Sequence, residues 1–195
     1  MRDIGRLVLV LVVICSLSAA SLSYVRTSLA TRIEQQGDYY VRGPALARLF
    51  QQPASQLLAN KVKITRDGTE YPVFYRKDGE QVTGLAVEAA GQGGYGGPIV
   101  MMIGIDLATD TVLGVEIVSH SETPGLGAQV EKAGFRQQWV GLPLGSSVAL
   151  AGSGGSVDAI TGATFSSSAM VDGTNQVLDL MNKNRAAILA EIAGR

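Results

Sequence analysis

The sequence predicts an α+β fold in which an N-terminal transmembrane helix precedes an antiparallel sheet flanked by helices. Three observations support this fold class. Residues 7–25 carry no charge, five short apolar segments between residues 61 and 118 are joined by short turns, and a helical periodicity fills residues 170–192. Strands that are joined by short turns pair antiparallel with their neighbours. A chain of 195 residues has room for one such domain and one appendage.

The first 25 residues suggest a membrane anchor. Residues 1–6 form a short polar head, and the uncharged residues 7–25, at ~1.5 Å per residue, match a ~30 Å hydrocarbon core. A cleaved signal peptide is the competing interpretation, because Ser18-Ala19-Ala20 fits a small-residue cleavage site. Lipidation at Cys15 is disfavoured by the bulky Ile14 before it. A very short head before a large domain indicates that the head is cytoplasmic and the domain lies outside.

Residues 26–60 are predicted to be a helical stalk. Residues 27–36 prolong the first helix, and residues 37–42 are expected to break it. Residues 44–60 have the apolar spacing of a second helix, and Pro53 marks a kink or boundary because proline removes a helical hydrogen bond. We expect this segment to pack or to act as a spacer.

Residues 61–195 make up the predicted folded domain. Its strands fall within residues 61–66, 71–75, 81–89, 99–105 and 112–118, with turn residues such as Asp67-Gly68 between them. Residues 129–139 are predicted to be helical. The glycine-rich segment 152–156 is predicted to be a loop, since it lacks the lysine of a phosphate-binding P-loop. The last helix repeats apolar residues at i, i+3, i+4 and i+7.

Composition excludes several function classes. The net charge of −1 and the absence of a basic run argue against nucleic-acid binding. One cysteine and one histidine exclude an intramolecular disulfide and a metal site built from these residues, so any redox chemistry requires an organic cofactor. Residues 91–96 fit the dinucleotide motif G-x-G-x-x-G, but Pro98 and an apolar β-rich run follow instead of a helix. A glycine-rich hairpin or bulge is the better interpretation, and it could leave room for a flat ring.

A short motif, Asp158-Ala159-Ile160-Thr161-Gly162-Ala163-Thr164, has the features of a phosphate site. Small residues allow close approach to the backbone, and the unpaired N–H groups at a helix start favour phosphate. The hydroxyls of Thr161, Thr164 and the three serines at 166–168 can donate to phosphate oxygens. A plain loop with a Ser/Thr helix cap is the alternative.

This motif resembles the Asp-x-x-(Ser/Thr)-Gly-Ala-Thr flavinylation motif of the FMN-binding domain family. That family includes the G subunit of Rnf-type ion-translocating oxidoreductases and the C subunit of sodium-translocating NADH:quinone reductase. Two further signatures, residues 94–99 and residues 120–127, occur upstream in the family's order. The resemblance implies that residues 61–195 form an FMN-binding domain in which a phosphoester joins FMN to Thr164.

The resemblance also implies which residues surround the flavin. Tyr95 is expected beside it, and in the loop from Glu122 to Gly127 Thr123 and free N–H groups would bond the ring edge while Leu126 packs on its face. Glu122 contacts the ring or caps the next helix. Asp158 either helps recognition of the motif or forms a turn. The complete predicted set is Thr164, Asp158, Thr161, Gly162, Ala163, Tyr95, Gly96, Glu122, Thr123, Gly125 and Leu126.

His120 ends a strand, and a surface or supporting position is favoured over a proton-donating one. A threonine hydroxyl is a poor nucleophile without an activating base. Asp158 lies near Thr164 in the sequence, but no lysine, cysteine or histidine does, so the chain is predicted not to flavinylate itself, and the resemblance implies an external flavin transferase that uses FAD.

The implied function is an electron-transfer subunit of an Rnf-type complex in the bacterial inner membrane. It would cross the membrane once, keep its C-terminal domain on the periplasmic side, bind other membrane subunits and turn over no substrate alone. Two alternatives stay open. The chain is an FMN-carrying subunit of another membrane or extracytoplasmic reductase, or it is a membrane-anchored binding module without redox activity.

Overall fold

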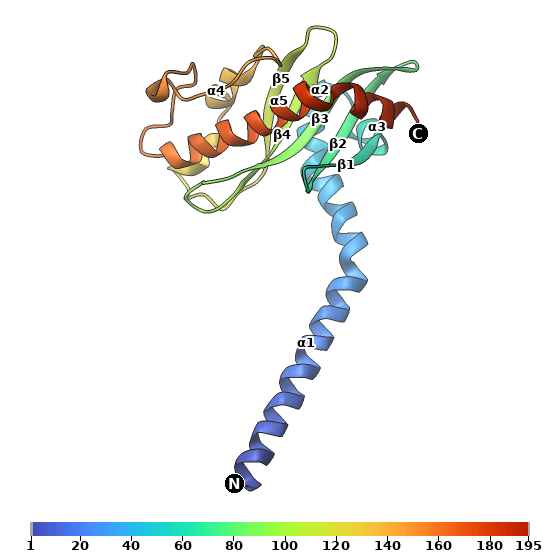
Figure 1. Ribbon diagram of the computed structural model, residues 1–195, viewed down its shortest axis with the longest axis vertical. Coiled ribbons are helices and arrows are strands. Elements are labelled where there is room, and N and C mark those ends of the chain that lie inside the picture. Colours follow the sequence, from blue (N-terminus) through green and yellow to red (C-terminus); the bar gives the residue numbers. More distant parts are fainter. Residues whose placement is uncertain (1, 195) are drawn as a thin grey trace. The chain divides into compact units, whose positions relative to one another are not determined.

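A computed structural model describes residues 2–194 of the chain (Figure 1). The chain divides into two compact units, with the boundary between Tyr40 and Val41. The first unit is dominated by helix α1, Arg2–Gly37, whose large apolar side chains are exposed. Within the described residues, this N-terminal helix is long and apolar enough to cross a membrane. The predicted apolar helix and its continuation through residue 36 are therefore confirmed.

The predicted break at residues 37–42 is wrong. A π-helical turn, η1 (Asp38–Arg42), follows α1, and helix α2 (Gly43–Phe50) begins immediately after it. No proline lies between residues 37 and 42, and one glycine costs a helix only about 1 kcal/mol. The second helix ends near Pro53 as predicted, and a short helix α3 (Ala54–Ala59) follows.

The sheet is a five-stranded antiparallel meander in which every strand pairs with its neighbours in the sequence. All five predicted strands are confirmed. They are β1 (Lys61–Arg66), β2 (Thr69–Asp78), β3 (Gln81–Gly91), β4 (Ile99–Asp106) and β5 (Thr111–Ser119).

Helices cover both faces of the sheet (Figure 1). The long last helix, α5 (Thr164–Ala193), packs on β3 and β4, while α2 and α3 pack on the other face. Because side chains alternate along a strand, neighbouring residues enter different cores. In β2, Val73 belongs to the core under α5, and Phe74 belongs to the core under α2 and α3.

Short helical turns connect β5 to the last helix. They are η2 (Gly127–Glu131), α4 (Ala133–Arg136), η3 (Gln137–Trp139) and η4 (Ala151–Ser153). Residues 129–139, predicted as one helix, are thus helical but divided into three pieces. Trp139 is fully buried in the core under α5 and fixes this segment to the sheet.

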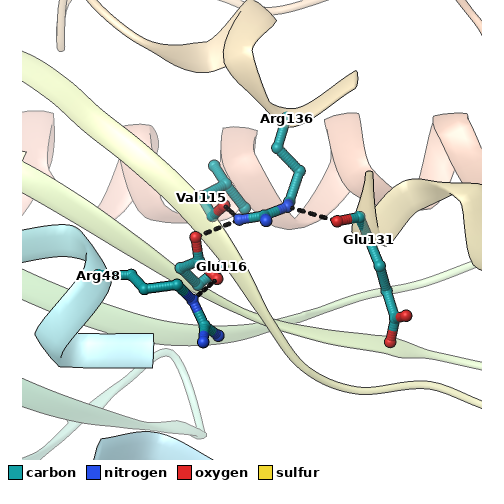
Figure 2. A network of polar contacts seen from close by, with 5 residues as sticks. All are labelled: Arg48, Val115, Glu116, Glu131 and Arg136. Atoms are coloured by element: carbon teal, nitrogen blue, oxygen red, sulfur yellow. Dashed lines mark hydrogen bonds and ion pairs between the residues drawn. The ribbon is translucent and has the colours of Figure 1, made fainter. Parts of the chain in front are cut away.

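Two buried glutamates tie flanking elements to the sheet, and Glu116 on β5 is one of them. It lies between Arg48 of α2 and Arg136 of α4 and accepts hydrogen bonds from both guanidinium groups (Figure 2). Arg136 also donates to the carbonyl oxygens of Val115 and Glu131, at 2.9 and 3.1 Å. This network fixes the positions of α2 and α4 on β5.

Helix α5 approaches the sheet very closely at the end of β3. A Cβ atom at Gly91 would lie 1.8 Å from the carbonyl oxygen of Ala169, so only glycine fits there. Met101 fills the space beside Gly173 in the same way, with its Cε atom 2.8 Å from where a Cβ would lie. This close packing places the N-terminal end of α5 above the ends of β3 and β4.

Candidate functional site

Three loops meet at one end of the sheet. Gly91 pairs with Ile99 across the β3–β4 connection, and Ser119 at the end of β5 pairs with Val100. The β3–β4 loop and the loop after β5 therefore leave the sheet side by side. The third loop, residues 158–163, leads into α5, which crosses this end of the sheet. The three sequence signatures thus come together in space.

The motif at residues 158–164 forms a tight turn followed by a helix. The N–H of Ala163 donates to the carbonyl of Ile160 at 2.9 Å, and Gly162 has a φ of +78° that suits glycine. Thr164 is the first residue of α5, and its side chain is exposed. Ala163 at the N-cap cannot accept a side-chain hydrogen bond from the first turn. The start of this 30-residue helix therefore presents uncapped N–H groups beside an exposed hydroxyl.

The beginning of the motif is held by Gln138. The backbone N–H of Asp158 donates to Gln138 Oε1 at 2.7 Å, and Gln138 Nε2 donates to the Asp158 carbonyl at 3.3 Å. The side chain of Asp158 is left exposed by this arrangement. Sequence reasoning missed Gln138, because it lies twenty residues upstream and outside every signature.

A buried carboxylate connects the three signatures. Glu122 is only 6% exposed, and its two oxygens accept from different elements. The Gly96 N–H donates to Oε1 at 2.9 Å, and the Ser166 hydroxyl donates to Oε2 at 2.6 Å. Glu122 therefore fastens the β3–β4 loop to the first turn of α5. Its contact with α5 is made through the Ser166 hydroxyl, so Glu122 does not cap the backbone of that helix.

His120 supports the same loop. Its Nδ1 accepts a hydrogen bond from the backbone N–H of Glu122 at 3.0 Å, so Nε2 carries the ring hydrogen and donates to Glu131 Oε1 at 3.0 Å. Both ring nitrogens are used within the protein. The supporting position that the sequence favoured for His120 agrees with this geometry.

The glycines of the signatures make room for protein atoms. A Cβ at Gly96 would lie 2.1 Å from the carbonyl oxygen of Ser121, and one at Gly127 would lie 2.2 Å from Glu122 Oε2. The space that the sequence left open for a flat ring is thus filled at these positions by the neighbouring loop. The missing side chains allow Glu122 to sit between the loops.

A cleft of about 320 Å³ opens where the loops meet. Its rim carries exposed apolar groups, since Tyr95 is 77% exposed, Phe165 68% and Leu126 43%. Such an apolar rim with a few polar groups inside is typical of a site for a flat organic molecule. The lining residues are Tyr95, Glu122, Thr123, Leu126, Gly127, Gly162, Ala163, Phe165 and Ser166.

Six of the predicted contact residues line this cleft, and five lie beside it. Thr164, Thr161 and Asp158 are exposed on the adjoining loop and helix start, Gly96 holds the loop contact, and Gly125 sits in the turn after Thr123 with a φ of +76°. The sequence did not single out Gly127 and Phe165 as contact residues, although both lie within or next to the signatures.

Two of the three serines after Thr164 are used inside the protein. Ser166 donates to Glu122, and Ser167 donates to the Ala163 carbonyl at 3.0 Å while accepting from the Ile160 N–H at 2.9 Å. Both are buried, and only Ser168 is exposed. The expectation that all three serines face a phosphate is therefore not met.

Comparison with known proteins identifies the family of the chain. Residues 94–179, which contain all three signatures, match the FMN-binding domain family. The chain is 32% identical over 188 residues to the G subunit of the ion-translocating oxidoreductase complex of Methanosarcina acetivorans, covering 93% of this chain and 96% of that protein. The chain belongs to this family of G subunits. The family suggested by the sequence motifs is confirmed.

Further relatives extend this result. The corresponding G subunit of Pseudomonas aeruginosa is 33% identical over 131 residues, which cover 63% of this chain and 61% of that protein. A solved structure, the C subunit of the Na(+)-translocating NADH-quinone reductase from Parabacteroides distasonis, matches 77% of this chain and 94% of its own with a TM-score of 0.58 and 22% identity. This structural likeness confirms the predicted fold.

Proposed function

We propose that the chain is the FMN-carrying electron-transfer subunit of an Rnf-type ion-translocating oxidoreductase complex, with FMN joined through its phosphate to Thr164. The observation that carries this proposal is the exposed Thr164 hydroxyl at the start of α5, beside a cleft with an aromatic rim. The FMN-binding domain match and the names of the relatives support it. Bound FMN supplies electron-transfer chemistry that the side chains of the domain do not provide.

The residues around the cleft fit this cofactor. The Thr164 oxygen would hold the phosphate, and the N–H groups of the first turn of α5, with the hydroxyl of Thr161, would stabilise its negative charge. Tyr95, Leu126 and Phe165 would offer exposed apolar surface to the ring. Glu122 does not need to touch the ring, because its two hydrogen bonds position the loops that do.

Attachment requires a second protein. Among residues 2–194, the Thr164 hydroxyl has no hydrogen-bond partner that could remove its proton. A flavin transferase must supply the base and the FAD. In that reaction the threonine oxygen would bond the phosphorus of the FMN half, the pyrophosphate bond would break, AMP would leave, and the hydroxyl proton would pass to the transferase. The exposed Asp158 side chain is free to be recognised by that enzyme.

The membrane helix α1 and the covalent bond between FMN and Thr164 fit the same function. Helix α1 crosses the inner membrane once, with residues 7–25 as the span, and the folded domain lies on the periplasmic side. There, a non-covalently bound FMN that escaped could not be replaced from the cytoplasm, so a covalent bond keeps the carrier loaded. The other membrane subunits of the complex donate and accept the electrons.

The attachment is tested by producing the full chain together with a flavin transferase and measuring flavin fluorescence of the denatured protein in a gel. The wild-type chain and Thr161→Ala should fluoresce, and Thr164→Ala should not. Fluorescence that persists in Thr164→Ala places the bond elsewhere. Flavin that leaves the wild-type chain on denaturation favours a non-covalent binding module.

The complex is tested separately. The proposal expects an affinity-tagged chain, produced in its own host, to co-purify with other membrane subunits of an ion-translocating complex. Co-purification with a different membrane reductase would assign the flavinylated chain to that enzyme instead. A protease added to intact spheroplasts should remove the folded domain, and protection of the domain would contradict its periplasmic position.

A further inference from the structure

The sheet opens between its second and third strands. The β1–β2 pairing extends to Arg66 and Thr69, and the β3–β4 pairing extends to Gly91 and Ile99. The β2–β3 pairing stops earlier, at Val73 and Val87. Residues 69–72 and 88–91 therefore belong to two hairpins that diverge (Figure 1). Residues 69–72 pair with β1 and residues 88–91 pair with β4, and neither segment has a strand partner on the side that faces the other.

The alternation of an antiparallel strand shows which backbone groups face this opening. In a hairpin with the two-residue turn Asp67-Gly68, the flanking residues Arg66 and Thr69 bond each other. Along β2, the backbone groups of Glu70 and Pro72 therefore point toward β3. Pro72 has no N–H, so it cannot complete a reciprocal pair with β3 and helps to end the ladder there.

The same alternation applies to the facing strand. Because Ala86 is bonded to Phe74 of β2, Glu88 and Ala90 also point toward the opening. The carbonyl of Ala90 supports this assignment, because it accepts side-chain hydrogen bonds from Gln92 Nε2 at 3.0 Å and Gln176 Nε2 at 3.2 Å. A carbonyl engaged in the β4 ladder would face the other way. The opening thus has donors and acceptors on both rims.

A cleft of about 520 Å³ occupies this opening. Strands in a sheet lie about 4.8 Å apart, and an added strand bonds one or both neighbours at that spacing. Backbone donors and acceptors that repeat every second residue match an extended polypeptide, whose own groups repeat in the same way. The apolar surfaces of Tyr71, Pro72 and Val100 in the lining suit its alternate side chains.

The charged side chains at the opening are paired within this chain. Glu70 lies 3.3 Å from Lys63, and Glu88 accepts from Arg42 at 2.8 Å. Asp172 accepts at 2.7 Å from the Gln92 backbone N–H and at 2.7 Å from the Gln176 amide. A ligand recognised mainly by charge finds no unpaired carboxylate among these groups. A partner would therefore bind this opening mainly through backbone hydrogen bonds.

We propose that the opening between β2 and β3 binds an extended segment of another subunit of the complex by β-strand addition. The identity of this partner rests on the proposed function, whereas the geometry of the opening does not. The occupant bonds the backbone groups of Glu70 and the N–H groups of Glu88 and Ala90, since the Ala90 carbonyl already accepts from Gln92 and Gln176. It completes the inner edges of the two hairpins, since an uncovered strand edge is available for pairing.

The proposal is tested by amide hydrogen exchange on the full chain, alone in detergent and in the purified complex. The N–H groups of Glu88 and Ala90 should exchange at least about tenfold more slowly in the complex, the effect of one added hydrogen bond. Val87 and Ala89 are matched controls, because their N–H groups point toward β4 and should change little. Unchanged exchange at Glu88 and Ala90 in an intact complex overturns the proposal.

A variant provides a second measurement. Ala90→Pro removes the N–H on the rim without removing a ladder bond, and it should weaken retention of the chain by the complex about tenfold. Flavin attachment at Thr164 should persist in this variant. If the complex retains the Ala90→Pro chain as tightly as the wild-type chain, the assignment is contradicted. It is also contradicted if the amide protection of the isolated chain rises with its concentration, because a second copy of the chain would then fill the opening. If no complex purifies with the flavinylated chain, the proposed function fails first.

Discussion

The buried Glu122 carboxylate gives a quantitative test of how the loops of the site are held. Glu122→Ala removes the acceptors of the Gly96 N–H and of the buried Ser166 hydroxyl. Each hydrogen bond to a charged group contributes about 1.5–3 kcal/mol, so the two together contribute about 3–6 kcal/mol. Removing a buried charge recovers part of its desolvation cost. We expect a net loss of about 2–4 kcal/mol in the free energy of unfolding.

Glu122→Gln is the graded control. The amide oxygen still accepts from the Gly96 N–H, and the amide nitrogen can donate to the Ser166 oxygen once that hydroxyl rotates. Both hydrogen bonds survive, but neither is strengthened by charge. The loss should therefore be about 1 kcal/mol.

Urea unfolding of the full chain in detergent measures these differences. Trp139 is the only tryptophan and is fully buried, so its fluorescence reports unfolding of the domain. The measurement uses protein without flavin, in a Thr164→Ala background, to separate folding from cofactor binding. A loss below about 1 kcal/mol for Glu122→Ala would refute the network as the element that holds the loops. Equal losses for alanine and glutamine would show that charge, rather than hydrogen bonding, matters.

Three further predictions follow from the contacts. Gly127→Ala places a Cβ 2.2 Å from Glu122 Oε2 and should lower the free energy of unfolding in urea by about 2 kcal/mol. Gly134→Ala is the control, because no atom lies within 4 Å of its added Cβ, and it should leave the stability of the domain unchanged. Glu116→Ala leaves two arginines without their buried partner and should cost about 3 kcal/mol, while Lys183→Ala, which breaks an exposed pair, should cost under about 0.5 kcal/mol by the same assay. Gln138→Ala frees the start of the loop that leads to Thr164, so the proposed flavin incorporation, measured over time, should slow while thermal stability changes little. An unchanged rate would show that the amide does not order the loop.

Much of the fold could be predicted from sequence because its signals are local. The β-hairpin at Asp67-Gly68, the strand alternation and the helical spacing from Met170 onward depend on neighbouring residues. The error at residues 37–42 arose where a glycine competes with the hydrogen bonds of a continuing helix. Such a balance of about 1 kcal/mol is decided by context that a sequence pattern does not contain.

The candidate site was only partly predictable. The motifs identified the exposed Thr164 and the loops that carry Tyr95 and Leu126, because small residues and turn signals mark them. The contacts of Glu122 could not be assigned, since its partners Gly96 and Ser166 lie far away in the sequence and meet only when α5 packs on β3. Gln138 gave no signal, because a single amide outside a motif has no pattern.

The order of the strands has a consequence for biosynthesis. Each strand of the meander finds its partner as soon as the next hairpin leaves the ribosome or the export channel, but α5 comes last and spans Thr164–Ala193. The threonine reaches its final surroundings only after this helix docks against the Gly91 backbone. A truncated or half-assembled chain therefore lacks the finished surroundings of Thr164, so the proposed attachment of FMN requires a completed molecule.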